Sequence, residues 1–211
     1  EVYIIDGKEY TAANIVSVFN GEIDFQGYSL SFNKMTTSGK SMGAFFSNIG
    51  PKGKIYNAVF NFKGETTTRY YDTGFLCRFN YGHIHDVIVN YQGGSATANQ
   101  YFGLLCRINS VTGLIERFVI SNNPEDGLVP FAARYSAGLV AANNEGIVRN
   151  GYVYGSDIYS ETGDTSVGGD IYVGGILGGQ SSKGQTSNVY SLVNVSVAKF
   201  RASFAFSISP L

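Results

Sequence analysis

The feature that most constrains the fold of this 211-residue chain is an internal repeat of paired glycines. Each unit starts with a glycine followed by mostly apolar residues, and a second glycine follows a short distance later. The leading glycines are 31, 29, 35 and 37 positions apart: Gly43, Gly74, Gly103, Gly138 and Gly175. The second glycines are Gly53, Gly82, Gly113, Gly146 and Gly184. Helical repeats need long stretches with a period of about 3.6 residues and few glycines, so the pattern favours stacked coils of strands.

The residues after each second glycine alternate as a β-strand does. An aliphatic residue expected to face inward recurs in four copies: Ile55, Ile84, Ile115 and Val148. The next residue is expected to face outward: Tyr56, His85, Glu116 and Arg149. Mostly short polar side chains that tolerate left-handed backbone come two residues after the inward position: Asn57, Asp86, Arg117, Asn150 and Asn188. We interpret this position as a corner, and the second glycines and the corner asparagines as structural.

In a parallel coil, equivalent residues stack about 4.8 Å apart and form ladders. We therefore predict an all-β protein, a right-handed parallel β-helix (β-solenoid) of about five to six imperfect coils. Residues 1–42 are predicted to form an opening or capping coil and residues 43–195 five repeats, and residues 196–211 a closing strand or the start of a further segment. The variable spacing is assigned to insertions that loop out between the coils: 63–72, 92–100, 122–136 and 155–170.

At these residues the chain resembles the GLUG repeat, and the clearest copy spans residues 137–153. In that copy Ala141 stands where the family usually has its second glycine, which only Gly178 keeps. The resemblance covers roughly residues 43–195. Similar repeats occur in large bacterial cell-surface and secreted proteins, including adhesin-like chains and the non-catalytic part of IgA-cleaving metallopeptidases. The resemblance therefore implies a secreted or cell-surface location in bacteria more than it implies a chemistry.

Charge and hydropathy exclude two classes of partner. The formal net charge is -1 and the basic residues are scattered, so no nucleic-acid partner is expected. No apolar run approaches the roughly 20 residues that span a bilayer, so no membrane insertion of this segment is expected. The first six residues lack the features of a signal peptide, and we expect the chain to be a segment of a longer protein.

Few residues suggest chemistry, and no cofactor or metal is expected. Cys77 and Cys106 hold the same place in adjacent repeats, where two buried thiols are expected and a disulfide is the alternative. His83 and His85 are the only histidines, too few ligands for a zinc site. The loop 155–170 has oxygen ligands, but their order departs from known calcium-binding loops, so a solvated loop is expected and a calcium site is the alternative.

Two functions from different classes fit this pattern. The favoured one is a non-enzymatic surface module, either an adhesive or ligand-binding face or a rigid spacer. The alternative is a carbohydrate-active β-helix of the polysaccharide lyase or glycosidase type. Carboxylates fall mostly in the expected loops and none is expected to form an outward cluster. Paired outward carboxylates about 5 to 9.5 Å apart in a cleft would support an enzyme, whereas an uncharged aromatic face would argue against one.

Exposed aromatic side chains with polar tips suit protein interfaces and sugar faces. Tyrosines occur in every repeat, where covering of flat sheet surfaces is the expected role and an elongated binding side is the alternative. Two arginines share a slot on adjacent coils, which ladder packing explains without a ligand. The predicted binding surface comprises Tyr70, Tyr71, Tyr152, Tyr154, Tyr172, Arg78 and Arg107. The expected partner is a protein or glycan of a host or of a cell surface.

Overall fold

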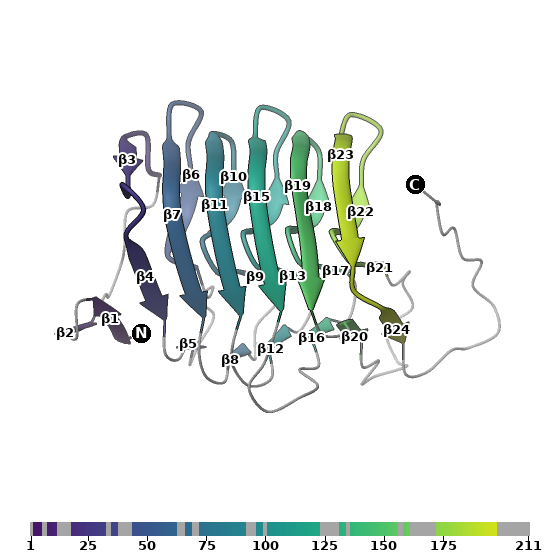
Figure 1. Ribbon diagram of the computed structural model, residues 1–211, viewed down its shortest axis with the longest axis horizontal. Helices are drawn as coiled ribbons and strands as arrows, with labels where there is room; N and C mark the ends of the chain where they lie inside the picture. The colour runs from purple at the N-terminus through teal and green to yellow at the C-terminus, as the bar shows by residue number, and fades with distance from the viewer. Residues whose placement is uncertain are drawn as a thin grey trace.

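The computed structural model describes residues 2–5, 8–11, 18–32, 35–37, 44–62, 66–68, 72–91, 96–98, 101–122, 131–133, 136–155, 158–160 and 172–197. Over these residues the chain is all-β, and parallel strands from successive coils stack side by side into a β-solenoid (Figure 1). The predicted fold class is therefore confirmed.

Two sheets form the broad walls of the solenoid. The front sheet has the order β23-β19-β15-β11-β7-β3, with β4 also paired to β7. Its strands are β3 (Glu22–Asp24), β4 (Ser29–Phe32), β7 (Lys54–Phe62), β11 (His83–Tyr91), β15 (Leu114–Asn122), β19 (Ile147–Gly155) and β23 (Gln185–Leu192). The back sheet contains β6 (Phe46–Ile49), β10 (Cys77–Asn80), β14 (Cys106–Asn109), β18 (Ala141–Asn144) and β22 (Leu177–Gln180). In Figure 1 the back sheet lies behind the front one.

Short strands close each coil between these two walls. One sheet contains β5 (Met35–Thr37), β8 (Thr66–Thr68), β12 (Ala96–Ala98) and β16 (Phe131–Ala133). Another contains β9 (Asp72–Gly74), β13 (Tyr101–Gly103), β17 (Ser136–Gly138) and β21 (Tyr172–Gly174). The strands β20 (Ile158–Ser160) and β24 (Val195–Val197) pair in parallel, and β1 (Val2–Ile5) pairs antiparallel with β2 (Lys8–Thr11).

The number of complete coils differs slightly from the predicted five to six. Among the described residues, three coils place a strand in each of the four principal sheets: β7–β10, β11–β14 and β15–β18. The coil β19–β22 departs at β20, which pairs with β24 instead, and the first and last coils contribute only some of their strands. Coils at the two ends have a neighbour on one side only, so part of their pairing is missing.

The predicted insertions are not purely loops. Each contains a three-residue strand, β8, β12, β16 or β20, that pairs with a neighbouring coil. A coil must turn back from the front sheet to the back sheet, and a short paired strand at that turn satisfies backbone groups that a bare loop would leave to solvent. Sequence spacing alone did not reveal these strands.

The front strands stack in the register that the repeat predicts. Ile84 pairs with Ile55 on one side and with Ile115 on the other, and Ile115 pairs with Val148. All four side chains are fully buried and belong to one continuous apolar core. In the fifth copy the equivalent residue is Thr186, which is exposed at the end of the stack. On the other side of the coil the fifth copy is shifted by one residue from the prediction: Gly138 pairs with Gly174 rather than with Gly175, and Ala141 pairs with Leu177 rather than with Gly178.

The corner residues interrupt the strand alternation. The φ angles are 53° at Asn57, 53° at Asp86, 49° at Arg117, 55° at Asn150 and 52° at Asn188. Gln26 also has a φ of 52°, but it lies with Gly27 (φ 81°) in a turn between β3 and β4 rather than at a strand corner. The side chain buried before the corner in β7 is Ile55 and the next is Ala58, a step of three rather than two. Each front strand therefore carries two facets that meet at the corner.

A row of buried amides runs through the back-sheet side of the core. Asn80, Asn109 and Asn144 are fully buried at equivalent positions of β10, β14 and β18. Asn80 Nδ2 donates to Asn109 Oδ1 at 2.8 Å, and Asn109 Nδ2 donates to Asn144 Oδ1 at 2.8 Å. Asn144 Nδ2 donates in turn to Gln180 Oε1 at 3.3 Å. We call these three asparagines the amide ladder. The repeat pattern did not predict this ladder.

Close stacking of the turns explains the second glycines better than backbone freedom does. A Cβ added at Gly113 would collide with the carbonyl oxygen of Asn80, and one at Gly146 with that of Gly113. Neither glycine has a positive φ. The turns of adjacent coils approach so closely that only a residue without a side chain fits between them.

Candidate functional site

The corner divides the outer surface of the front sheet into two facets of different chemistry. Side chains before or at the corner form the charged facet: Glu22, Asp24, Lys54, Tyr56, His83, His85, Asp86, Glu116, Arg117 and Arg149. Outward side chains after the corner form the uncharged facet: Ser29, Ser31, Val59, Asn61, Ile88, Asn90, Val119, Ser121, Tyr152, Tyr154, Tyr190 and Leu192. The two facets therefore offer different surfaces to a partner.

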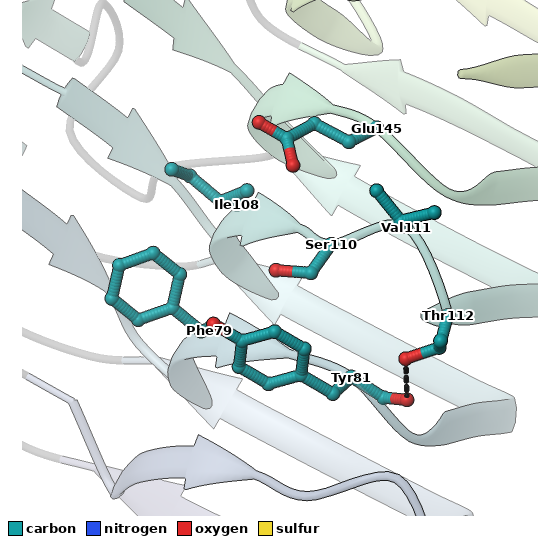
Figure 2. A pocket seen from close by; sticks show the side chains of 7 residues that line it. All are labelled: Phe79, Tyr81, Ile108, Ser110, Val111, Thr112 and Glu145. Atoms are coloured by element: carbon teal, nitrogen blue, oxygen red, sulfur yellow. Dashed lines mark hydrogen bonds between the residues drawn. The ribbon is translucent and has the colours of Figure 1, made fainter. Parts of the chain in front are cut away.

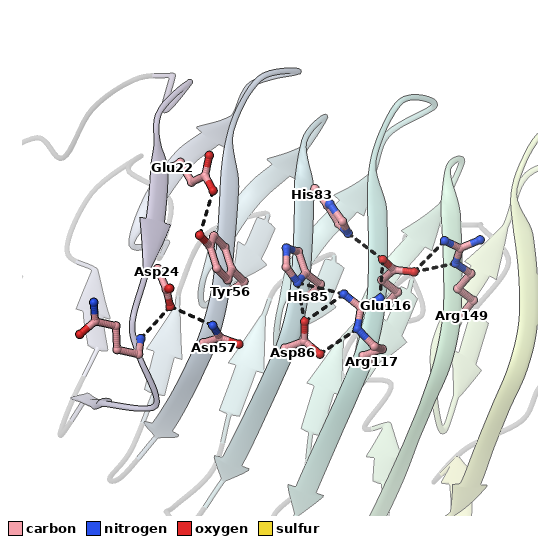
Figure 3. A network of polar contacts seen from close by, with 11 residues as sticks. Glu22, Asp24, Tyr56, Asn57, His83, His85, Asp86, Glu116, Arg117 and Arg149 are labelled. Carbon is pink, nitrogen blue, oxygen red and sulfur yellow. Dashed lines mark hydrogen bonds and ion pairs between the residues drawn. The ribbon is translucent and has the colours of Figure 1, made fainter.

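Glu116 is the centre of the charged facet (Figure 3). Its carboxylate lies 3.0 Å from His83 Nε2, 2.8 Å from Arg117 Nη1 and 2.7 Å from Arg149 Nη2. Alternation puts Glu116 outward, yet these partners leave only 6% of its side chain exposed. Burial on its own raises the pKa of Glu116, but hydrogen bonds from Arg149, Arg117 and His83 outweigh it, and the pKa is lowered overall.

Asp86 is the second anionic group of the charged facet. Arg117 donates to it twice, from Nε at 2.8 Å and from Nη2 at 2.9 Å, and His85 Nδ1 lies 2.6 Å from it. These contacts, chiefly those from Arg117, lower the pKa of Asp86 to about 2. Arg117 thus links Asp86 on β11 to Glu116 on the next coil, in β15.

This cluster corrects the expectation that no outward carboxylates gather on successive coils. The available signal was the register: Asp86 and Arg117 hold the same corner position on adjacent coils, and His85, Glu116 and Arg149 are paired neighbours. The lowered pKa values keep both carboxylates ionised, so neither carries the proton that a general acid must donate. The arrangement is that of a stabilising ion network.

Aromatic and polar contacts extend the charged facet to the first coil. Tyr56 donates to Glu22 at 2.8 Å and stacks on the His85 ring with centroids 4.7 Å apart. Burial, and then the neighbouring His85, lower the pKa of His83. Within the described part of the chain, no group of three or more His, Cys, Asp or Glu side chains is arranged to hold a metal ion.

The uncharged facet combines an amide row with exposed aromatic rings. Asn90 Nδ2 donates to Asn61 Oδ1 at 2.9 Å, which orders neighbouring coils on this surface. Tyr152 and Tyr190 are paired neighbours that are 44% and 64% exposed. Leu192 is 76% exposed beside them, and the Tyr154 ring stacks against Tyr152 with centroids 5.8 Å apart. The facet is most apolar and most exposed over β19 and β23.

The predicted binding residues do not share one surface. Tyr152 and Tyr154 lie on the uncharged facet, Tyr172 lies on β21, and Arg78 and Arg107 lie on the back sheet. Tyr70 and Tyr71 lie outside the described residues, as do residues 156–157 and 161–171, which include most of the predicted calcium-binding alternative. The structure brings together the two arginines and, separately, the two front-sheet tyrosines.

A shallow depression of about 280 Å³ lies at the back-sheet edge, where β10 and β14 run into their turns (Figure 2). Its lining is Phe79, Tyr81, Ile108, Ser110, Val111, Thr112 and Glu145. We call it the back-sheet depression. The repeat pattern does not predict this depression, because its lining comes from three coils and from turn residues outside the repeat motif.

The two cysteines lie under the same sheet. Cys77 and Cys106 are paired neighbours on β10 and β14, both fully buried and both free thiols in this structure. Burial raises the pKa of the Cys77 thiol well above its ordinary value, with the adjacent Cys106 adding to the effect. Their environment is that of core residues rather than of a nucleophile.

A scan of family models and searches of the curated proteins and of the solved structures found no match to this chain. No helix in the described residues is long and apolar enough to cross a membrane. The class that the structure itself defines is a parallel β-solenoid with one continuous core.

Proposed function

We propose that this chain is a non-enzymatic repeat module of a larger bacterial secreted or cell-surface protein, and that it presents a ligand-binding, adhesive face on a rigid stack of coils. The observation that carries the proposal is the uncharged facet, a flat surface across consecutive coils with exposed tyrosines and no charged side chain among its members. The bacterial surface location rests on the resemblance to the GLUG repeat.

The electrostatics of the front sheet favour binding over cleavage. Hydrolysis of a glycosidic bond needs one carboxyl group that is protonated and another that is free to attack or to activate water. Asp86 and Glu116 have lowered pKa values and share Arg117 as an ion-pair partner. On the uncharged facet there is no carboxylate to do this chemistry. The proposed partner is accordingly a glycan or protein that the facet holds without altering it.

Rigidity follows from how the coils are joined. Each front strand pairs in parallel with the strands of both neighbouring coils, and apolar, amide and aromatic side chains continue through the core. Displacing one coil would break backbone bonds to two neighbours and expose core surface on both sides. A stack of this kind holds a binding face in a fixed orientation relative to whatever it joins.

A glycan array with a product assay tests the proposal. The chain should bind a subset of the immobilised glycans, and mass spectrometry of the same glycans in solution should show no cleavage products. Tyr152→Ala combined with Tyr190→Ala should weaken binding about tenfold or more, since exposed aromatic anchors dominate such interfaces. Tyr28→Ala is the matched control, because Tyr28 is 74% exposed but precedes β4 at the opposite end of the front sheet from β19 and β23. Cleavage products, or binding that the facet variant leaves unchanged, would refute the proposal.

A further inference from the structure

We infer that the ligand of the uncharged facet is a linear, uncharged polysaccharide that lies along the axis of the solenoid, across the strands. This inference rests on the proposed function, of which it names the chemical class and the orientation of the ligand. The ligand follows a column of outward side chains, one from each coil, which we call the apolar column: Val59, Ile88, Val119, Tyr152 and Tyr190.

The apolar column crosses the front sheet without a break. Each member is the paired neighbour of the next, so each front strand from β7 to β23 contributes one apolar or aromatic side chain (Figure 1). At a strand spacing of about 4.8 Å, the column extends over about 19 Å. Ile88 is 43% exposed, Tyr152 is 44% exposed and Tyr190 is 64% exposed, so a ligand can reach the column. A surface that repeats its contact at each coil matches a ligand that also repeats, which is a regular polymer.

Polar side chains border the apolar column on both sides. On one side lie the corner residues, of which Asn57, Asn150 and Asn188 are exposed. On the other side lie Asn61 and Asn90, which a hydrogen bond of 2.9 Å joins. Because an amide group has two N–H donors and an acceptor oxygen, a row joined by single bonds keeps donors and acceptors for a ligand. A linear chain of pyranose rings has the same division, with C–H groups on its faces and hydroxyl groups along both edges.

The lack of charge on the facet argues against a charged polymer. None of the side chains that form the uncharged facet is ionisable to a carboxylate or a cation. A carboxylate or sulfate group of a ligand would therefore lose water here without gaining an ion pair, which is unfavourable. At the corner, Asp86 and Arg117 neutralise each other through hydrogen bonds of 2.8 and 2.9 Å. An uncharged glycan needs only hydrogen bonds and ring packing, and the tyrosines supply the packing.

Calorimetry of the full chain with cello-oligosaccharides, from the disaccharide to the hexasaccharide, tests the inference. These probes are linear and uncharged, and they differ only in length. The hexasaccharide should bind about tenfold or more tightly than the disaccharide, because each added sugar contacts a further coil. A glucuronic-acid oligosaccharide of the same linkage and length should bind about tenfold more weakly than the hexasaccharide. Equal affinity for the short and long chains, or a preference for the charged chain, would overturn the inference.

Ile88→Lys tests whether the ligand follows the apolar column. Ile88 lies two coils from Tyr152, and a lysine there places a charge across the path of a long chain. The hexasaccharide should lose about tenfold in affinity and the disaccharide less, because the tyrosine rings hold the shorter chain. Val111→Lys is the matched control, since Val111 is 55% exposed but lines the back-sheet depression, and it should leave both affinities unchanged. Equal losses in the two variants, or no loss with Ile88→Lys, would contradict the axial path.

The outcomes separate this inference from the proposed function. If an array ligand lost binding on combined Tyr152→Ala and Tyr190→Ala substitution while the cello-oligosaccharides did not bind, the proposed function would stand and the inference would be wrong. If no ligand depended on these two tyrosines, the proposed function itself would be refuted.

Discussion

The amide ladder makes the sharpest prediction for stability. Asn109 lies in its middle, fully buried, and its amide group bonds to both neighbouring coils. Asn109→Ala removes this group from a region where no solvent can replace it. Asn143→Ala is the matched control, because Asn143 lies on the adjacent strand next to the ladder residue Asn144 but faces outward and is only half-buried.

The magnitude follows from the contacts that are lost. Four hydrogen bonds disappear: Asn109 accepts from Asn80 Nδ2 at 2.8 Å, and its Nδ2 donates to Asn144 Oδ1 at 2.8 Å and, in longer bonds, to the Ile147 carbonyl at 3.1 Å and the Gly113 carbonyl at 3.3 Å. Each of the two short bonds has a net value of about 1 kcal/mol. The Asn144 oxygen keeps the backbone N–H of Gly146 at 3.2 Å, but the buried Asn80 donor loses its acceptor, which costs about 1 to 3 kcal/mol. We therefore expect Asn109→Ala to lower the free energy of unfolding by about 4 kcal/mol.

Urea unfolding followed by far-ultraviolet circular dichroism measures this effect. The chain has no tryptophan, so strand content is a better probe than intrinsic fluorescence. We expect the midpoint to fall while the dependence on urea concentration stays unchanged, since the fold and its buried surface are kept. The Asn143→Ala control should stay within about 0.5 kcal/mol of the original chain. If Asn109→Ala matched that control, the ladder would not be a source of stability and the argument from buried amides would be wrong.

Three further predictions follow from the ion network, the corners and the cysteines. The pKa of Asp86 is about 2 in the folded chain against an ordinary value of 3.8, so the contribution of Asp86 to the free energy of unfolding is present above about pH 4 and is lost as the pH falls toward 2. Asp86→Asn should therefore reduce the fall in the free energy of unfolding between about pH 4 and pH 2. An unchanged fall over that range would contradict the stabilising role of the Asp86–Arg117 ion pair. Asn188→Ala should cost about 1 to 2 kcal/mol in urea unfolding because its φ is 52°, whereas Asn188→Gly should stay closer to the original chain. In the absence of reductant, a thiol reagent should label Cys77 and Cys106 only after the chain is unfolded, because both thiols are buried. If the unfolded chain showed no reactive thiol, the two cysteines would form a disulfide instead.

The unequal placement of the tyrosines bears on how the module would engage a partner. Tyr152, Tyr154 and Tyr190 gather over the last two front strands, whereas the earlier coils present Val59 and Ile88 at the same outward column. Removing rings at the aromatic end should therefore affect binding more than substitutions in the earlier coils. Such a difference between the two ends would indicate a localised binding site. Equal effects along the facet would indicate that the tyrosines only cover the sheet.

Local chemistry made part of this molecule predictable from its sequence. Alternation of inward aliphatic and outward polar residues is a property of a single strand, and it placed Ile55, Ile84 and Ile115 in the core. Asparagine tolerates a left-handed backbone within its own residue, so the corner at Asn57 and Asn150 could be expected without knowing any neighbour. Repetition of these local signals was sufficient to predict a solenoid of stacked strands.

The functional surfaces depended on contacts between coils. Arg117 bonds to Asp86, 31 positions earlier, and the amide ladder joins residues 29 and 35 positions apart. The repeat predicts which positions of the front strands are neighbours, but it does not show which long polar side chains reach across from one coil to bond with the next. The back-sheet depression and the uncharged facet arise in the same way. The sequence by itself determined the coil and its corners, because these depend on each residue's own conformational preference. The tertiary structure alone decided which polar side chains of different coils bond to one another and which turns border the back-sheet depression, because that depends on how side chains and turns pack.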